Sequence, residues 1–162
     1  MRTSISRLLA VLVFVPALLL TGLAVSASPA NAAVVSTTTL QADIMRFTNY
    51  QRAKAGCKPV RPDARLMLAA HAHSAWMAQT GTFSHVGRNG STFDARIRTA
   101  GYATPRSENI AWGYRSGAEV VTAFMHSAGH RANLLDCTAK AVAIAAVYST
   151  NGTPYYTQDF GR

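Results

Sequence analysis

The amino-terminal 32 residues constrain the fold most, because they have the three parts of a removable export signal. Arg2 and Arg7 make the start positive, an apolar run follows over residues 8–25, and Ala30-Asn31-Ala32 supplies the small residues of a cleavage site. The run is about 18 residues long, near the minimum for spanning a bilayer, so a retained membrane anchor is the alternative. The small-residue site and the lack of charge after it favour cleavage. We therefore predict a signal peptide at residues 1–32 and a secreted, extracellular product.

Cleavage would leave residues 33–162, within the size range of one domain. We assign 33–39 to a short leader and 40–162 to the domain. No later stretch is long and apolar enough to span a membrane, so we expect no transmembrane segment after cleavage. We also expect a monomer.

The chain has two cysteines, Cys57 and Cys137, which lie 80 positions apart. In an oxidising destination a single disulfide between them is the expected state, with a reactive free thiol as the alternative. Closing such a loop would stabilise the fold by roughly 4 kcal/mol in the chain-entropy model. The C-x-x-C spacing of redox catalysts is absent.

The formal net charge is +9, but the basic residues are scattered and no nucleic-acid-binding motif accompanies them. Nucleic acid is therefore not an expected partner. For an exported chain, the anionic partner would be membrane lipid or a cell-envelope component. A cationic protein that acts on such a surface is one function class that the charge leaves open.

Apolar periodicity and capping signals predict a mostly helical first part of the domain. The predicted helices and their boundary residues are 40–55 with Thr38 and Gln41, 63–80 with Asp63 and Gly81, a short one around Ile97 with Ser91, Asp94 and Gly101, one opened by Ser116 and Glu119 that ends near Gly129, and a turn at 130–135.

The end of the chain changes to a strand-like pattern. Residues 141–148 are rich in β-formers, Asn151-Gly152 is a strong hairpin signal, and 155–160 alternates apolar and polar side chains. Residues 108–114 also form an extended segment. Helices must cover this small antiparallel sheet, so we expect a layered α+β domain.

Two pairs of histidines resemble known metal or catalytic patterns, but neither pair completes one. His71 and His73 point apart on a helix and cannot share one metal ion, so we predict that His73 is a core residue and His71 is exposed. His126 and His130 are four apart, but Ser127 stands where a zinc protease needs glutamate. Ser127 beside His130 also suggests a serine nucleophile, although no Gly-x-Ser-x-Gly elbow surrounds it.

His85, Glu108 and His130 are the strongest candidates for chemistry. All three fall in or beside predicted loops, where a rigid scaffold can present side chains. Two imidazoles and one carboxylate can bind a divalent cation such as zinc.

These residues are embedded in a specific series of motifs. The blocks are Asn49-x-x-Arg52-x-x-x-Gly56, Phe83-Ser84-His85, Arg96-Ile97-x-x-Ala100-Gly101-Tyr102, Glu108-Asn109-Ile110-Ala111, Gly129-His130-Arg131-x-Asn133 and Tyr155-Tyr156-Thr157-Gln158-Asp159-Phe160-Gly161. Their order and spacing closely resemble the bacterial, SCP-like branch of the CAP superfamily, which includes cysteine-rich secretory proteins, antigen 5 and pathogenesis-related class 1 proteins. The resemblance covers residues 40–161.

The resemblance implies a three-layer α–β–α sandwich with a shallow cleft. In many members, the cleft holds two histidines and two glutamates that can bind zinc or another divalent ion. His85, Glu108 and His130 match three of these positions, whereas the second glutamate falls at Ser127. A hydroxyl there removes one negative charge, so a bound dication would be less well compensated.

Three neighbouring residues have supporting roles in this interpretation. Asn109 and Asn133 are expected to satisfy backbone groups, and Arg131 is expected to pair with Glu108 or Asp136 and so lock the cleft.

Because the chain has no complete nucleophile set and no general-base pair, we expect a non-catalytic, secreted binding module. The resemblance allows a metal ion, a lipid or sterol, or an envelope component as its ligand. The alternative is an extracellular, peptidase-like hydrolase that uses His85, Glu108 and His130.

Overall fold

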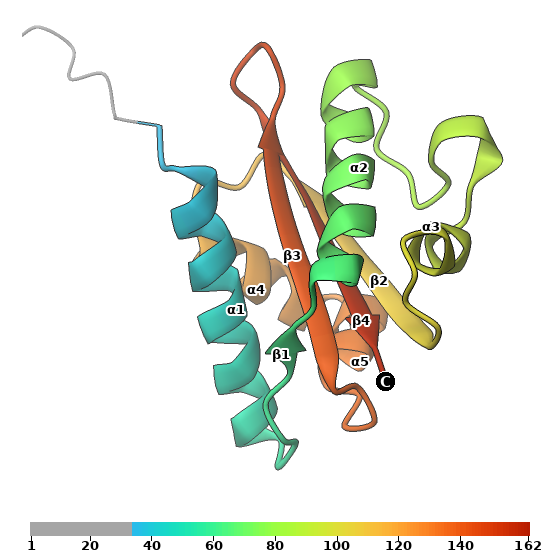
Figure 1. Ribbon diagram of the computed structural model, residues 1–162. Coiled ribbons are helices and arrows are strands. Elements are labelled where there is room, and N and C mark those ends of the chain that lie inside the picture. Colours follow the sequence, from blue (N-terminus) through green and yellow to red (C-terminus); the bar gives the residue numbers. More distant parts are fainter. Residues whose placement is uncertain (1–33) are drawn as a thin grey trace, which may run out of the picture. The chain divides into compact units, whose positions relative to one another are not determined.

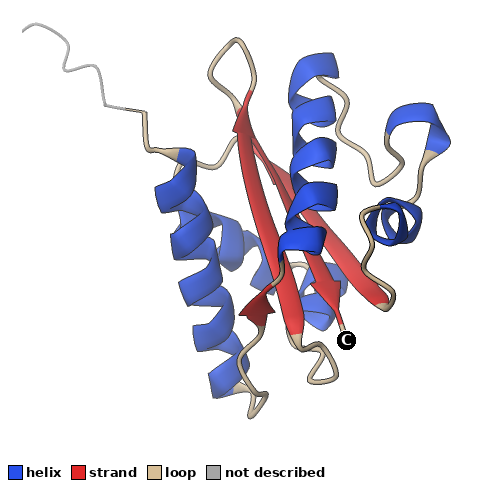
Figure 2. Cartoon of the chain, viewed as in Figure 1, coloured by secondary structure: helices blue, strands red, loops and turns tan. Residues whose placement is uncertain are grey.

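The computed structural model describes residues 34–162, so the predicted signal peptide lies outside the described part of the chain. Residues 34–162 form helices on both faces of a four-stranded sheet, the predicted α–β–α sandwich (Figures 1 and 2). Among these residues, no helix has both the length and the apolar character needed to cross a membrane.

The sheet has the strand order β1-β3-β4-β2. The predicted hairpin is confirmed: β3 (Ala141–Tyr148) and β4 (Pro154–Gly161) pair antiparallel, and Gly152 takes the positive φ of 79° in the turn between them. β2 (Pro105–Trp112) pairs antiparallel with β4 and forms one edge of the sheet. The expectation of a purely antiparallel sheet is wrong in one detail, because the two-residue β1 (Arg61–Pro62) runs parallel to β3.

Alternating side chains of β3 divide the core into two layers. Val142 and Ile144 pack with α1 (Thr37–Lys54) and α4 (Gly117–His126), on the face that also carries α5 (Ala128–Leu134). Ala143 and Ala145 face α2 (Ala64–Thr80) and α3 (Phe93–Thr99). The small alanine side chains allow α2 to lie close to the sheet.

Most predicted helix ends are confirmed. The side chain of Asp63 accepts hydrogen bonds at the start of α2, Gly81 ends that helix at a φ of 69°, and Ser116 and Glu119 form the capping box of α4. Two starts are wrong by one or two residues. The N-cap of α1 is Ser36 rather than Thr38, and that of α3 is Thr92 rather than Ser91.

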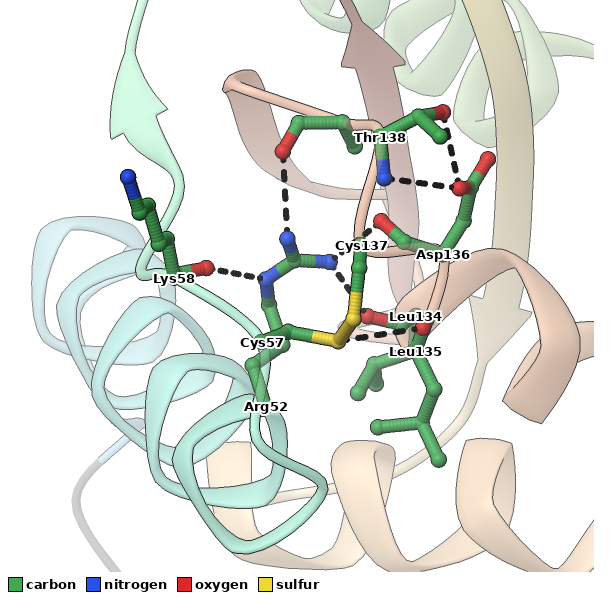
Figure 3. Close-up of a disulfide and its surroundings, with 9 residues drawn as sticks. Arg52, Cys57, Lys58, Leu134, Leu135, Asp136, Cys137 and Thr138 are labelled. Atoms are coloured by element: carbon green, nitrogen blue, oxygen red, sulfur yellow. Dashed lines mark hydrogen bonds between the residues drawn. A yellow bond between two sulfur atoms is a disulfide. The ribbon is translucent and has the colours of Figure 1, made fainter.

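The predicted disulfide between Cys57 and Cys137 is confirmed, and it lies beside a buried arginine (Figure 3). The guanidinium of Arg52 has no exposed surface and donates hydrogen bonds to four backbone carbonyls. The acceptors are Lys58 O, Leu134 O, Asp136 O and Ala139 O, at 2.9–3.1 Å. Arg52 and the disulfide thus hold the end of α1 against the connection between α5 and β3.

Removing the disulfide by Cys57→Ser/Cys137→Ser should lower the free energy of unfolding by about 2–4 kcal/mol, because the unfolded chain regains the freedom of a long loop. Urea unfolding of the oxidised protein and the variant measures this difference. Treating the variant with a reducing agent should have no further effect. Equal stability of the two proteins would show that the bond does not constrain the unfolded state.

Lowering the pH should destabilise the connection between α5 and β3, because Asp136 there becomes protonated. Burial alone would raise its pKa, but hydrogen bonds from Arg106 and Thr138 lower the pKa of Asp136 to about 2. A lowered folded-state pKa adds stability above the unfolded-state value, and this is lost as the pH falls from about 4 to about 2. Unfolding titrations of Asp136→Asn should show a flatter acid limb than those of the unmodified protein. A limb of unchanged slope would contradict this assignment.

Candidate functional site

Pockets lie along β2, a strand at the edge of the sheet, and the candidate histidines His85 and His130 line two of them. The charged pocket, of about 410 Å³, is lined by His85, Phe93, Arg106, Ser107, Glu108 and Asn133. The aromatic pocket, of about 260 Å³, lies towards the end of β2, and its lining includes Phe83, Trp112, Tyr114, Phe124, Ser127 and His130. The candidate residues His85 and Glu108 therefore face one pocket, and His130 faces the other.

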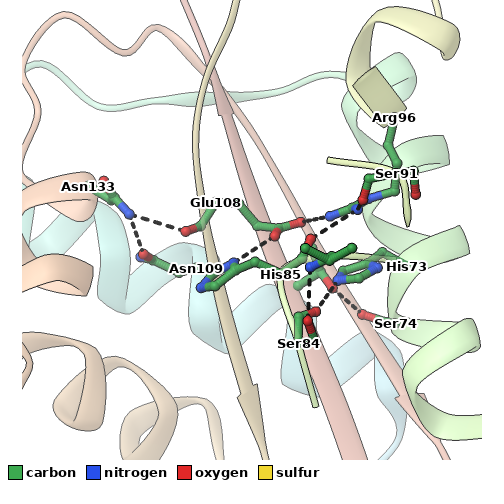
Figure 4. A network of polar contacts seen from close by, with 11 residues as sticks. His73, Ser74, Ser84, His85, Ser91, Arg96, Glu108, Asn109 and Asn133 are labelled. Atoms are coloured by element: carbon green, nitrogen blue, oxygen red, sulfur yellow. Dashed lines mark hydrogen bonds and ion pairs between the residues drawn. The ribbon is translucent and has the colours of Figure 1, made fainter. Parts of the chain in front are cut away.

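A network of charged and polar groups lies at the charged pocket (Figure 4). Glu108 projects from β2 towards α3, and its side chain is only 1% exposed. Its Oε1 lies 2.8 Å from Nδ1 of His85, and its Oε2 accepts a hydrogen bond of 2.6 Å from Nη2 of Arg96. Both oxygens of the carboxylate are therefore engaged within the protein.

Arg96 also fixes the loop that carries His85. Its Nη1 donates to the carbonyl oxygens of His85 and Ser91, at 3.1 and 2.7 Å. The loop can approach this closely because residue 87 is glycine: a Cβ atom there would lie 2.9 Å from Nη1 of Arg96. The guanidinium thus neutralises Glu108 and positions the histidine beside it.

A second carboxyl group lies next to Glu108 in the core. Asp159 of β4 is directly opposite Glu108 in the strand register and has no exposed surface. Burial, and secondly the Glu108 carboxylate, raise the pKa of Asp159 well above its usual value. The charged form of Asp159 is therefore disfavoured, and Arg96 and Glu108 form the ion pair of this cluster. Sequence reasoning missed the roles of Arg96 and Asp159, although both stand in the motifs that carry the family resemblance.

The two histidines of α2 behave as predicted. His73 is buried, its Nε2 lies 2.9 Å from the carbonyl oxygen of Ser84, and burial lowers its pKa. His71 is exposed.

The side chains at the four expected metal-ligand positions do not fit a divalent metal ion. These positions are His85, Glu108, Ser127 and His130. In the part of the chain described, residues 34–162, no group of three His, Cys, Asp or Glu side chains could hold one. The arginine already supplies a positive charge to Glu108, and Ser127 offers no carboxylate. The structure thus pairs His85 with Glu108 but does not complete the expected trio with His130.

His130 lies on α5, and its ring packs against Phe124 at 5.1 Å between ring centres. Burial, and secondly the nearby His85, lower the pKa of His130, so the ring is neutral at pH 7. Because α4 ends at His126 and a new helix starts after Ser127, His126 and His130 do not share one helical face. None of the side-chain hydrogen bonds found among residues 34–162 uses the His130 ring or the Ser127 hydroxyl.

Two asparagines connect α5 to β2, as predicted. Nδ2 of Asn133 donates to the carbonyl oxygen of Glu108 at 3.1 Å, and Nδ2 of Asn109 donates to that of His130 at 3.3 Å. The predicted ion pair of Arg131 is wrong, because Arg96 takes Glu108 and Arg106 takes Asp136.

The aromatic pocket has a fixed, exposed indole at its rim. Trp112 is 53% exposed, and it stacks on the buried Tyr155 with 6.3 Å between ring centres and 22° between planes. Phe83 lies 6.4 Å away at a tilt of 53°. Trp112 and Tyr155 are directly opposed in the β2–β4 register, so the sheet sets the orientation of the indole.

The amino-acid sequence matches one protein family and two proteins of Bacillus subtilis. The model of the cysteine-rich secretory protein family, CAP, matches residues 45–160. The Bacillus subtilis protein YkwD is 33% identical over 144 residues, which are 83% of this chain and 55% of that protein. The B. subtilis membrane protein YlbC is 29% identical over 124 residues, which are 76% of this chain and 34% of that protein. This chain thus spans about half of the first relative and a third of the second.

Solved structures show the same fold. An extracellular protein from Bacillus anthracis that contains an SCP domain has a TM-score of 0.69 and 24% identity, over 78% of this chain and 41% of that one. An outer surface protein from Borrelia burgdorferi has a TM-score of 0.71 and 19% identity, over 79% and 96% of the two chains.

Proposed function

The chain belongs to the cysteine-rich secretory protein (CAP) family, and on this premise we propose that it is a non-catalytic binding module that holds its ligand in the aromatic pocket. The observation that carries this proposal is the stack of Trp112 on Tyr155 in a pocket with two polar side chains, Ser127 and His130, that make no side-chain hydrogen bond within residues 34–162. Ligand sites typically combine apolar walls with a few polar groups that fix orientation.

The charged pocket is less suited to capture a ligand. Its carboxylate is already neutralised by Arg96 and bonded to His85, so a ligand would have to displace an internal ion pair. By contrast, the indole of Trp112 exposes apolar surface to water, and a ligand could cover that surface.

We also propose that the module acts outside the cell after removal of residues 1–32, with a leader at 33–39 and the domain at 40–162. The amino-terminal export pattern and the extracellular or surface relatives support this location. The positive net charge would favour an anionic lipid or envelope surface nearby.

Amide and side-chain NMR spectra recorded with a library of small charged and uncharged fragments test the binding proposal. Fragments that bind should shift the signals of Trp112, Tyr114 and His130 together. The control surface is around Leu68, which is exposed on α2 and lines a separate pocket. Hits confined to that surface, or no hits in the aromatic pocket, would overturn the proposal.

A second candidate function, a peptidase-like hydrolase, is favoured by one observation. The buried Glu108 orients an imidazole, that of His85, whose side chain is 53% exposed. A carboxylate behind a histidine is the arrangement of a general base. Cleavage of a peptide library by the purified protein, lost in both His85→Ala and His130→Ala, would support this function. Equal cleavage by the variants would assign the activity to a contaminant.

A further inference from the structure

We propose that the aromatic pocket binds an uncharged, glucose-configured oligosaccharide, with one sugar ring stacked on Trp112. This inference rests on the proposed function and names the ligand class of the same site. Three features carry it: the fixed indole, the neutral hydrogen-bonding groups and the uncharged lining.

The fixed indole supplies a flat apolar surface at low entropic cost. One side of Trp112 is supported by the buried Tyr155, and Phe83 restrains its edge. A β-linked glucose or N-acetylglucosamine ring has equatorial substituents, so its axial C–H bonds form a flat apolar face. The electron-rich face of an aromatic ring attracts such polarised C–H groups.

Hydroxyl groups at the edge of the sugar need neutral partners, and the pocket offers them. The neutral imidazole of His130 has one donor and one acceptor nitrogen, and the hydroxyl of Ser127 can both donate and accept. Both side chains are half-buried, and their polar atoms are not engaged by other side chains in the described residues.

The lining also selects against charge. Of the residues that line this pocket, none is Lys, Arg, Asp or Glu. An anionic headgroup would find no countercharge there. An acyl chain could cover Trp112, but it would leave His130 and Ser127 desolvated without partners.

Calorimetric titration of the purified protein with cellotetraose and chitotetraose tests the inference. The tryptophan fluorescence that is lost in Trp112→Phe, where Trp76 alone remains, is a second readout. We expect saturable binding of at least one of the two sugars, weakened tenfold or more by Trp112→Ala and by His130→Ala. Tyr50→Ala is the matched control, because Tyr50 is 58% exposed on α1, away from the pocket, and should bind as the unmodified protein does. Trp112→Phe keeps an aromatic face and should retain part of the affinity, which separates a local effect from misfolding.

Three results would overturn the inference: no binding of either sugar, binding that Trp112→Ala leaves unchanged, or binding of dodecanoate that is tighter than that of both sugars and lost in Trp112→Ala. The last result would assign the pocket to an acyl chain. If the sugars fail while fragments still shift Trp112 and His130, only the ligand class is wrong. If neither sugars nor fragments reach the pocket, the proposed function fails with it.

Discussion

Arg96→Met is expected to lower the free energy of unfolding by about 3–5 kcal/mol at pH 7, because it leaves the buried Glu108 carboxylate without its countercharge. Urea unfolding monitored by circular dichroism measures the change.

The double variant Arg96→Met/Glu108→Gln separates the charge from the packing. With both charges removed, the stability should recover to within about 1–2 kcal/mol of the unmodified protein, because no unpaired buried ion remains. A loss below about 1 kcal/mol in Arg96→Met at pH 7 would contradict the assigned pairing.

The second large effect is expected at Arg52. Arg52→Met removes the donor of four backbone carbonyls, each costing about 1–3 kcal/mol when buried and unsatisfied, while it also removes a buried charge. We expect a net loss of about 3–5 kcal/mol, together with slower recovery of the native disulfide after reduction. Thermal and urea unfolding measure the first, and mass mapping of the disulfide during reoxidation measures the second.

Arg46→Met is the matched control for Arg52. Arg46 lies on the same helix, but its side chain is 64% exposed. It pairs with Asp43 and lies 4.0 Å from the centre of the Phe47 ring, so its loss should cost about 1 kcal/mol or less. Equal stability of Arg52→Met and Arg46→Met would contradict this prediction. It would mean that the four carbonyl oxygens find other hydrogen-bond donors when Arg52 is absent.

Much of the fold was predictable because local rules and tertiary packing agree. The hairpin follows from Asn151-Gly152, α2 from Asp63 and Gly81, and the start of α4 from Ser116 and Glu119. The disulfide followed from export and from the presence of only two cysteines.

The site was less predictable, because its pairings join residues that are distant in the sequence. The sequence suggested an ion pair between Glu108 and Arg131. In the structure, α3 places Arg96 beside Glu108 instead. The break at Ser127 separates His126 from His130, and no local signal other than Gly129 suggested it. The pairing of Asp159 with Glu108 depends on the strand register, which side-chain patterns alone do not specify for two polar residues.

Calorimetric titration with zinc chloride tests most directly whether His85, Glu108 and His130 form a metal site. Because Arg96 already neutralises Glu108 and Ser127 supplies no charge, we expect only the heat of dilution, identical in the unmodified protein and in His85→Ala/His130→Ala. A saturable 1:1 heat in the unmodified protein that is lost in the double variant would contradict this account of the cleft.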